Sequence, residues 1–340
     1  MSASFRKFLI TRILLTIPMV LILVTMVFFI LRILPGDPIR SQLGPRVSEA
    51  QAERMRERLG LNRPLHVQYF NFLYDMIRLD FGNALTQGER PIRDELAERF
   101  PATMELVIPA MLLTAVLGVF SGAYAAKHRK EPQDYLIRLF SIIIYSFPIF
   151  FLGLVFQIIF SVRLNWFPLA GRMDTLMLVN FKSITNFYVI DSILTGNWPA
   201  LRAALEHLVL PATALGLALS GVFVRLTRVN MIEMLQSDFI TAGRARGIHE
   251  KTLVYRHALR NTFIPIMTLM GLQFAILLAG AVLTETTFSW PGMGRYLFER
   301  IQLRDYTAVQ ATIGVFAMFV ALITLVMDLL YGFIDPRIRY

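Results

Sequence analysis

Six apolar stretches, each long enough to cross a lipid bilayer, constrain the fold of this 340-residue chain more than any other feature. They lie near residues 9–31, 102–126, 136–162, 207–229, 263–284 and 308–332. A helix of about 20 mainly apolar residues spans the hydrocarbon, and it satisfies its own backbone hydrogen bonds there. Hydrophobic residues make up 55% of the chain and charged residues only 17%, against about 45–50% and 25% in soluble proteins. The sequence therefore predicts an all-α, polytopic membrane protein with six transmembrane helices.

The first apolar stretch is predicted to be a retained helix, although the basic "FRKFLITR" before it resembles the start of a secretory signal. It is too long for the apolar part of a signal peptide, and it runs into "RILPGDP" without a small-x-small cleavage site. The chain contains no cysteine, which excludes disulfides, thiolate metal sites and cysteine nucleophiles.

Basic residues are distributed unequally between the two sides that six spans define. The N-terminus, residues 127–138, residues 225–260 and the C-terminus carry 16 Lys and Arg against 6 Asp and Glu, a net charge of +10. The loops on the opposite side carry a net charge of +2. Because basic loops stay in the cytoplasm, we expect both termini to be cytoplasmic. The high isoelectric point thus reports membrane topology, and no nucleic-acid partner is needed to explain it.

The long loop over residues 32–100 is expected to lie outside and to contain two short amphipathic helices. "SEAQ" at 48–51 reads as a capping box, and Gly60 is placed to end the helix that follows. Pro64 suits a first helical turn. One predicted face of this second helix carries Leu65, Tyr69, Phe72, Leu73, Met76 and Ile77. Both helices either pack on the spans or form a docking surface for an extracytoplasmic partner.

A basic segment over residues 230–262 connects two apolar spans on the predicted cytoplasmic side. Ser237 or Asp238 is a good N-cap, and Gly247 is placed to take the left-handed conformation that ends a short helix. A second helix is expected from about Glu250 to Arg260 before Pro265 marks the next span. Its basic side chains are Lys251, Arg256, His257 and Arg260. The small residues Ala242, Gly243 and Ala245 are expected to let another surface approach closely.

The sequence contains no complete zinc-protease or P-loop motif that would support a catalytic role. "HEKTL" at 249–253 lacks the second histidine of a zinc protease, and "AALEH" at 203–207 fails the inverted form. No glycine is followed by lysine, so the chain has no P-loop. We therefore expect a protein that neither hydrolyses ATP nor binds a metal ion.

Several polar residues within the spans leave a secondary transporter or channel open as an alternative. Ionisable residues in a membrane are functional candidates, but Glu105 and Asp328 lie near predicted span ends, which favours a structural role. Gln157 and Gln273 lie deeper, where they either join helices by hydrogen bonds or line a path for a polar substrate.

The stretch "LTETTFSWPGMGRYLFERIQLRDY", residues 283–306, follows the fifth span on the outer side. Pro291, Gly292 and Gly294 break a helix, and we expect Phe288 and Trp290 to anchor the turn in the aromatic belt. The alternative is an outer gate or a binding-protein contact, to which Glu285, Trp290 and Arg295 would contribute.

The wording of the basic segment, "DFITAGRARGIHEKTLVYRHALRNTFIPI", resembles the EAA loop of ATP-binding-cassette importer permeases, and specifically the dipeptide, oligopeptide and nickel permease family. Thr241, Ala242 and Gly243 stand where the general pattern has Glu-Ala-Ala, a departure that suits the peptide-permease branch. "ILPGDP", "LGLNRPLHVQY", "RFPATMEL", "RDYTAVQ" and "LLYGFIDPRIR" extend the resemblance along the chain. The most similar branch is that of B-type permease subunits of dipeptide importers.

The resemblance implies a type I importer fold, with a first transmembrane helix at 1–31, an extracytoplasmic loop at 32–100 and a five-helix permease core at 101–340. It implies a second homologous permease, two cytoplasmic ATPases that bind ATP and Mg²⁺, and an extracytoplasmic substrate-binding protein, in a prokaryotic inner membrane. It offers di- or oligopeptides as substrates, with nickel chelates, glutathione and oligosaccharides as alternatives. The residues that it assigns to ATPase coupling are Asp238, Thr241, Ala242, Gly243, Arg244, Arg246 and Gly247.

Overall fold

A computed structural model describes residues 3–33, 48–58, 60–84 and 90–334 of the chain. Regular structure in these ranges is helical, with α-helices and two short π-helical segments. Most of "ILPGDP" and the closing "DPRIR", both used in the sequence comparison, lie outside the described residues. The all-α prediction is confirmed for the described part of the chain.

Five single helices are long and apolar enough to cross a membrane. They are α1 (Ala3–Ile33), α5 (Ile92–Lys127), α10 (Trp198–Leu235), α13 (Leu259–Thr287) and α15 (Tyr306–Ile334). Two of them begin well before the predicted spans, because α5 and α10 extend outward as amphipathic turns. Ile92 and Leu96 at the start of α5 are buried while their neighbours are polar, a pattern that average hydropathy does not detect.

The predicted third span is not one straight helix. Its residues form α6 (Pro132–Ser146) and then α7 (Ile149–Phe156) with the π-helical η1 (Gln157–Arg163), and the two parts meet at 101°. Pro148 causes the break, since proline disfavours helical backbone at the residue before it, and Phe147 is extended with φ −81° and ψ 133°. The described residues thus contain five single candidate spans, or six if the bent pair is one span.

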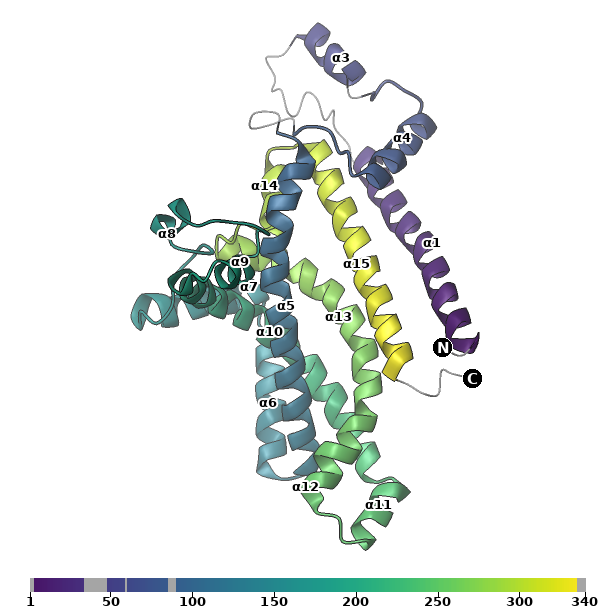
Figure 1. Cartoon of the computed structure of the whole chain (residues 1–340), viewed down its shortest axis with the longest axis vertical. Helices are drawn as coiled ribbons and strands as arrows, with labels where there is room; N and C mark the ends of the chain where they lie inside the picture. The colour runs from purple at the N-terminus through teal and green to yellow at the C-terminus, as the bar shows by residue number, and fades with distance from the viewer. Residues whose placement is uncertain (1–2, 34–47, 59, 85–89, 335–340) are drawn as a thin grey trace.

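The core of the molecule lies where α5 packs along α10 (Figure 1). Glycine brings the two backbones together: a Cβ on Gly122 would lie 2.7 Å from the carbonyl oxygen of Val224. On the other helix, a Cβ on Gly216 would lie 2.6 Å from the carbonyl oxygen of Ala110. Around this contact α13 adds further buried side chains to the same apolar cluster, and partly buried side chains of α15 pack against it. Small residues at helix crossings are a general feature of membrane bundles.

Helices α3 (Glu49–Arg58) and α4 (Leu65–Arg78) lie at one end of the molecule, and α11 (Asp238–Ala245) and α12 (Glu250–Thr252) lie at the opposite end (Figure 1). The capping box is confirmed, because the Gln51 amide donates to Ser48 Oγ and the Ser48 amide donates to Gln51 Oε1. Gly60 follows with φ +65°, as predicted.

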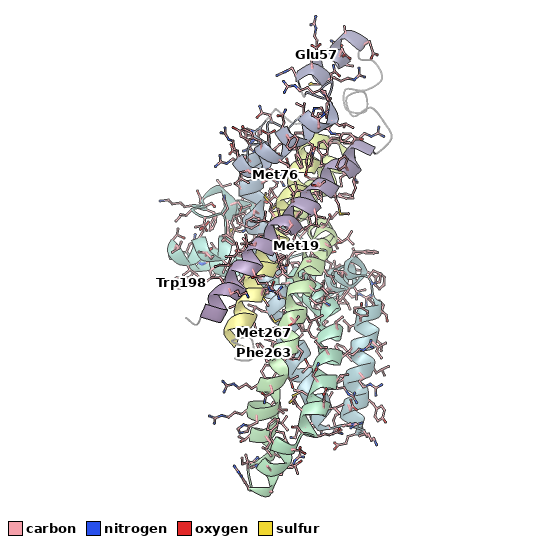
Figure 2. All side chains as sticks on the ribbon, turned by 90° about the vertical axis from the view of Figure 1, so that its right-hand side faces the viewer. Met19, Glu57, Met76, Trp198, Phe263 and Met267 are labelled. Carbon is pink, nitrogen blue, oxygen red and sulfur yellow. The ribbon has the colours of Figure 1, made fainter. Side chains whose placement is uncertain are left out.

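The prediction of which α4 residues face the spans is partly wrong. Tyr69, Phe72 and Met76 face the spans, but Leu65 is 57% exposed and Ile77 is 83% exposed. Met76 (Figure 2), in the last turn of α4, is buried against Gly314 of α15, whereas its neighbour Ile77 points to another side of the helix.

The peripheral helix α1 packs on α15 and α4. Arg12 of α1 forms an ion pair of 3.1 Å with Asp328 of α15. Asp328 lies in the last turn of the apolar stretch of α15, so its predicted place near a span end is confirmed. The remaining helices are α8 (Thr175–Val179), α9 (Tyr188–Leu194), α11 (Asp238–Ala245), α12 (Glu250–Thr252), η2 (Leu253–Ala258) and α14 (Met293–Gln302).

Candidate functional site

The basic segment forms a short helix that ends in a complete glycine cap. Helix α11 stops at Ala245, and Gly247 has φ +75°. The Gly247 amide donates to the Arg244 carbonyl oxygen at 2.9 Å, and the Ile248 amide donates to the Gly243 carbonyl oxygen at 3.1 Å. These two bonds define a Schellman motif. The predicted left-handed conformation of Gly247 is confirmed.

Helix α11 is fixed to the rest of the chain through its inner face. Ile240 is buried against Val254 and Ala258 of η2. A Cβ on Gly243 would lie 2.7 Å from Leu253 Cδ2, so this buried glycine faces η2 of its own chain. The prediction that Gly243 lets another surface approach is therefore wrong, whereas Ala242 and Ala245 are exposed.

Of two local predictions for this segment, the N-cap position at Ser237 is confirmed and the separate second helix is wrong. Ser237 is the N-cap residue of α11, but its hydroxyl donates to the Met234 carbonyl oxygen and makes no capping bond; Asp238 is the first helical residue. The expected separate helix from Glu250 to Arg260 does not end before the next span. Instead α12, η2 and α13 follow one another without a break, and Pro265 lies inside α13. Pro265 has no backbone N–H to donate within this helix, and prolines inside membrane helices are tolerated because neighbouring groups satisfy the freed carbonyl.

An ion pair closes the bend between α11 and α12. Arg244 donates to Glu250 at 2.8 and 3.1 Å. The hydrogen bond from Arg244 lowers the pKa of the Glu250 carboxyl and raises the pKa of Arg244. Both side chains are nearly half exposed, so the pair contributes little to stability. Thr241 and Arg246 are exposed on the same short segment.

The outer turn after α13 is built around a buried carboxylate. Glu285 accepts hydrogen bonds from Thr103 Oγ1 at 2.6 Å and from the Arg295 amide at 2.9 Å. Gly292 and Gly294 pack directly on this carboxylate, and a Cβ at either position would meet it. Arg295 turns its guanidinium to Glu299 at 2.8 Å. Glu285 therefore organises the turn, and its role as an outer gate with Arg295 stays a prediction.

The two aromatic residues of this turn do not lie in an aromatic belt. Trp290 is fully buried and donates from Nε1 to the Ala102 carbonyl oxygen at 2.8 Å. Phe288 is buried and packs near Gly153 of α7. The prediction of an interfacial anchor is wrong, because the turn folds back onto α5 and α7, which brings both rings inside.

The two intramembrane glutamines occupy different environments. Gln157 is buried and donates to the carbonyl oxygens of Leu169 and Thr287, at 2.8 and 3.2 Å. Gln273 is also buried, and its Oε1 atom meets no hydrogen-bond donor in the described part of the chain. Gln157 thus joins η1 to the end of α13. A role of either residue in the translocation path stays a prediction.

Glu105 anchors the segment between η1 and α9. It accepts from Arg172 Nε at 2.7 Å and from the Val189 amide at 2.6 Å, and both side chains of the ion pair are buried. The guanidinium also lies 3.7 Å from the ring centroid of Tyr188. The expected structural role of Glu105 thus has a defined partner in Arg172, which nothing in the local sequence indicated.

Two further buried ion pairs lie outside the predicted site. Arg300 of α14 binds Glu95 of α5 at 3.0 Å, and Tyr296 donates to the same carboxylate. Arg228 of α10 binds Asp134 of α6 at 2.6 and 2.7 Å. The spacing of Glu95, Arg99 and Thr103, one turn apart, could have indicated a polar stripe on α5. Their partners are distant in sequence and could not be chosen from it.

Comparison with known protein families shows to which family the chain belongs. Residues 116–340 match the family described as the binding-protein-dependent transport system inner membrane component, and residues 5–107 match the N-terminal part of the membrane component of such systems. The chain belongs to this family. It is accordingly a multi-pass membrane component of a binding-protein-dependent transport system.

Individual permeases of this family are similar along almost their whole length. The dipeptide transport system permease protein DppB of Alkalihalophilus pseudofirmus is 40% identical over 332 residues, which are 97% of this chain and 98% of that protein. The di/tripeptide transport system permease protein DppB of Pseudomonas aeruginosa is 41% identical over 92% of this chain and 93% of its own. The glutathione transport system permease protein GsiC of Escherichia coli is 36% identical over 98% and 99%.

A solved structure shares the fold of this permease. A chain of the MetNI methionine ABC transporter, in inward-facing conformations, has a TM-score of 0.52 and 13% sequence identity. The match covers 69% of this chain and 93% of that chain. At this identity the similarity establishes the fold, which is that of an ABC importer permease.

Proposed function

We propose that this permease imports di- or oligopeptides as one of two homologous membrane subunits of an ATP-driven importer. The names of the relatives at 40% and 41% identity support the peptide substrate. A substrate-binding protein delivers the peptide on the outer side, and two cytoplasmic ATPases, which bind ATP and Mg²⁺, drive the cycle. The protein lies in the inner membrane of a prokaryotic cell. Both termini and α11 are on the cytoplasmic side, which the charge distribution favours.

The observation that carries this proposal is the packed and continuous connection from α11 to the spans. Helix α11 is packed on η2 through Ile240 and Gly243, and η2 continues directly into α13. Helix α13 in turn packs on α5, α10 and α15. A force applied to the exposed face of α11 is therefore transmitted to the centre of the bundle. Closure of the ATPases on ATP would move α11 as a lever, provided that ATP-bound and ATP-free ATPases bind it differently.

The experiment concerns Gly247, whose positive φ ends the lever. Gly247→Ile places a β-branched residue in the left-handed region, at a cost of about 1–3 kcal/mol. No neighbouring atom lies within 4 Å of a Cβ there, so the strain is confined to the loop. We expect the variant to insert and to pair with the second permease, but to lose ATPase co-purification or substrate-stimulated hydrolysis and uptake in reconstituted vesicles.

The matched control is Gly196→Ile. Gly196 has φ +66°, and a Cβ there also meets no atom within 4 Å, but it lies in the turn between α9 and α10. The backbone strain is the same, and ATPase co-purification should be unchanged. Normal coupling in Gly247→Ile, or transport by the purified chain alone, would contradict the proposal.

Glutathione is a second candidate substrate, because a relative at 36% identity bears that name. Uptake of a labelled dipeptide into reconstituted vesicles, with unlabelled glutathione and unlabelled dipeptide as competitors, separates the two. Competition by dipeptides and not by glutathione is the expected result. The reverse order of competition would assign the permease to glutathione.

A further inference from the structure

Helix α4 has two apolar faces, of which the fold uses one. The inner face packs on the spans: Tyr69 donates to or accepts from Thr25 of α1 at 2.6 Å, and Phe72 stacks on Phe28 of α1 at 5.6 Å between ring centroids. Met76 on the same face contacts Gly314 of α15. This face accounts for the position of α4 on the bundle.

The second apolar face is exposed to the outside. Phe70 is 65% exposed, Tyr74 is 52% exposed and Ile77 is 83% exposed. Their spacing of four and three residues places them on one side of the helix. Arg78 lies over the ring of Tyr74 at 4.2 Å from its centroid. A third side of the helix is polar and carries Asn71 and Asp75, which are also exposed.

The position at which α4 contacts α1 along the membrane normal indicates the surroundings of the exposed face. The apolar stretch of α1 that can cross a membrane runs from Leu9 to Ile30. Thr25, which contacts Tyr69, lies five residues before its end, or about 8 Å at 1.5 Å per residue. Through the Tyr69 side chain, α4 therefore meets α1 about 8 Å before the outer end of its apolar stretch, which is the depth that the apolar face of an interfacial helix reaches.

The exposed apolar face also borders an apolar surface of α1 that this chain leaves uncovered. Only 11% of the apolar window of α1 is buried within the chain, and the side chains that it leaves exposed include Leu14, Ile22 and Ile30. Where that surface meets lipid, the exposed face of α4, which lies against α1, borders the same lipids. Arg78 lies beside the face, over the Tyr74 ring, and a cationic side chain at such a border extends to the headgroups.

We propose that α4 is an interfacial helix whose Phe70, Tyr74 and Ile77 insert into the outer headgroup layer of the bilayer. The inner face is held by α1 and α15, the second face contacts lipid, and the third, with Asn71 and Asp75, contacts water. Amphipathic helices with aromatic and basic residues bind membrane surfaces in this way. The helix thus sets the depth at which α1 and α15 leave the membrane.

Spin labels test this assignment, since the natural chain has no cysteine. Phe70→Cys and Ile77→Cys label the proposed lipid face, and Asn71→Cys and Asp75→Cys are matched controls on the polar face of the same helix. The full chain is reconstituted in vesicles of phosphatidylethanolamine and phosphatidylglycerol. Collisions with oxygen, which concentrates in lipid, are compared with collisions with a water-soluble nickel chelate.

We expect the ratio of oxygen to nickel collisions to be several-fold higher at positions 70 and 77 than at positions 71 and 75. Equal ratios at all four positions would overturn the proposal, because the helix would then stand in water. Shielding of positions 70 and 77 that arises only when the substrate-binding protein is added would also overturn it, and would assign this face to protein docking.

Discussion

At the scale of single residues, buried charges are paired across long sequence distances. Glu105 and Arg172 lie 67 positions apart, and Glu95 and Arg300 lie 205 apart. Isolated ions are too costly to bury, and pairing with hydrogen bonds offsets that cost. Each pair therefore ties an outer segment to α5: Arg172 fixes the segment before α9, and Arg300 fixes α14.

Removing one member of such a pair should be much more damaging than removing both. Glu105→Ala leaves the Arg172 guanidinium buried without its carboxylate, and we expect a loss of about 3–5 kcal/mol in the free energy of unfolding. The double variant Glu105→Leu with Arg172→Met should recover part of this loss, because no unpaired charge remains. Thermal unfolding of the purified chain in detergent measures both.

The control for this prediction is Glu206→Ala, in the exposed pair with Arg202. Exposed pairs are worth about 0–1 kcal/mol, so its unfolding midpoint should remain close to that of the natural chain. An equal loss in Glu105→Ala and Glu206→Ala would mean that the Glu105 pair does not stabilise the fold.

At the scale of elements, the contact between α5 and α10 depends on glycines one turn apart. Gly118 and Gly122 form a GxxxG pattern, and a Cβ on Gly118 would meet the Cβ of Phe223. Close backbone approach gives these helices their long interface, as in other membrane helix pairs. The GxxxG pattern can be read from the sequence, but the sequence does not show that α10 is the helix that packs against it.

Gly122→Ala should loosen this interface. The added Cβ would lie 2.7 Å from both Thr227 Cβ and the Val224 carbonyl oxygen, so the helices must separate. Overpacking of this kind costs about 1–3 kcal/mol, which a lower thermal unfolding midpoint would reveal. Gly271→Ala is the control, since its nearest contact is an ordinary 3.4 Å to Met327 Cβ. A midpoint for Gly122→Ala as high as that of Gly271→Ala would argue against tight packing at this crossing.

At the scale of the whole molecule, the two ends differ in construction. At one end α11 packs on η2 next to α12, whereas the opposite end carries α3 and α4 (Figure 1). The excess of basic residues lies on the side of α11. This distribution predicts that α11 is cytoplasmic and that α3, α4 and α14 are outside.

Cysteine labelling in intact cells measures this orientation directly. Single cysteines at Lys130 and Lys251 should react with a membrane-impermeant maleimide only after the cells are opened. Single cysteines at Glu57, Leu176 and Ile301, all exposed in the structure, should react from the outside without permeabilisation. Labelling of position 251 in intact cells would reverse the orientation.

Local patterns in the sequence determined the helical class, the number of apolar stretches, the capping box at Ser48 and the left-handed Gly247, because each depends on neighbouring residues alone. Tertiary structure decided the rest. It placed Trp290 and Phe288 inside rather than at the membrane surface, since the outer turn folds back onto α5 and α7. It joined α12 to α13 through η2, and it selected Arg172 as the partner of Glu105. These outcomes depend on which segments are in contact in the folded chain, and hydropathy and residue spacing do not specify those contacts.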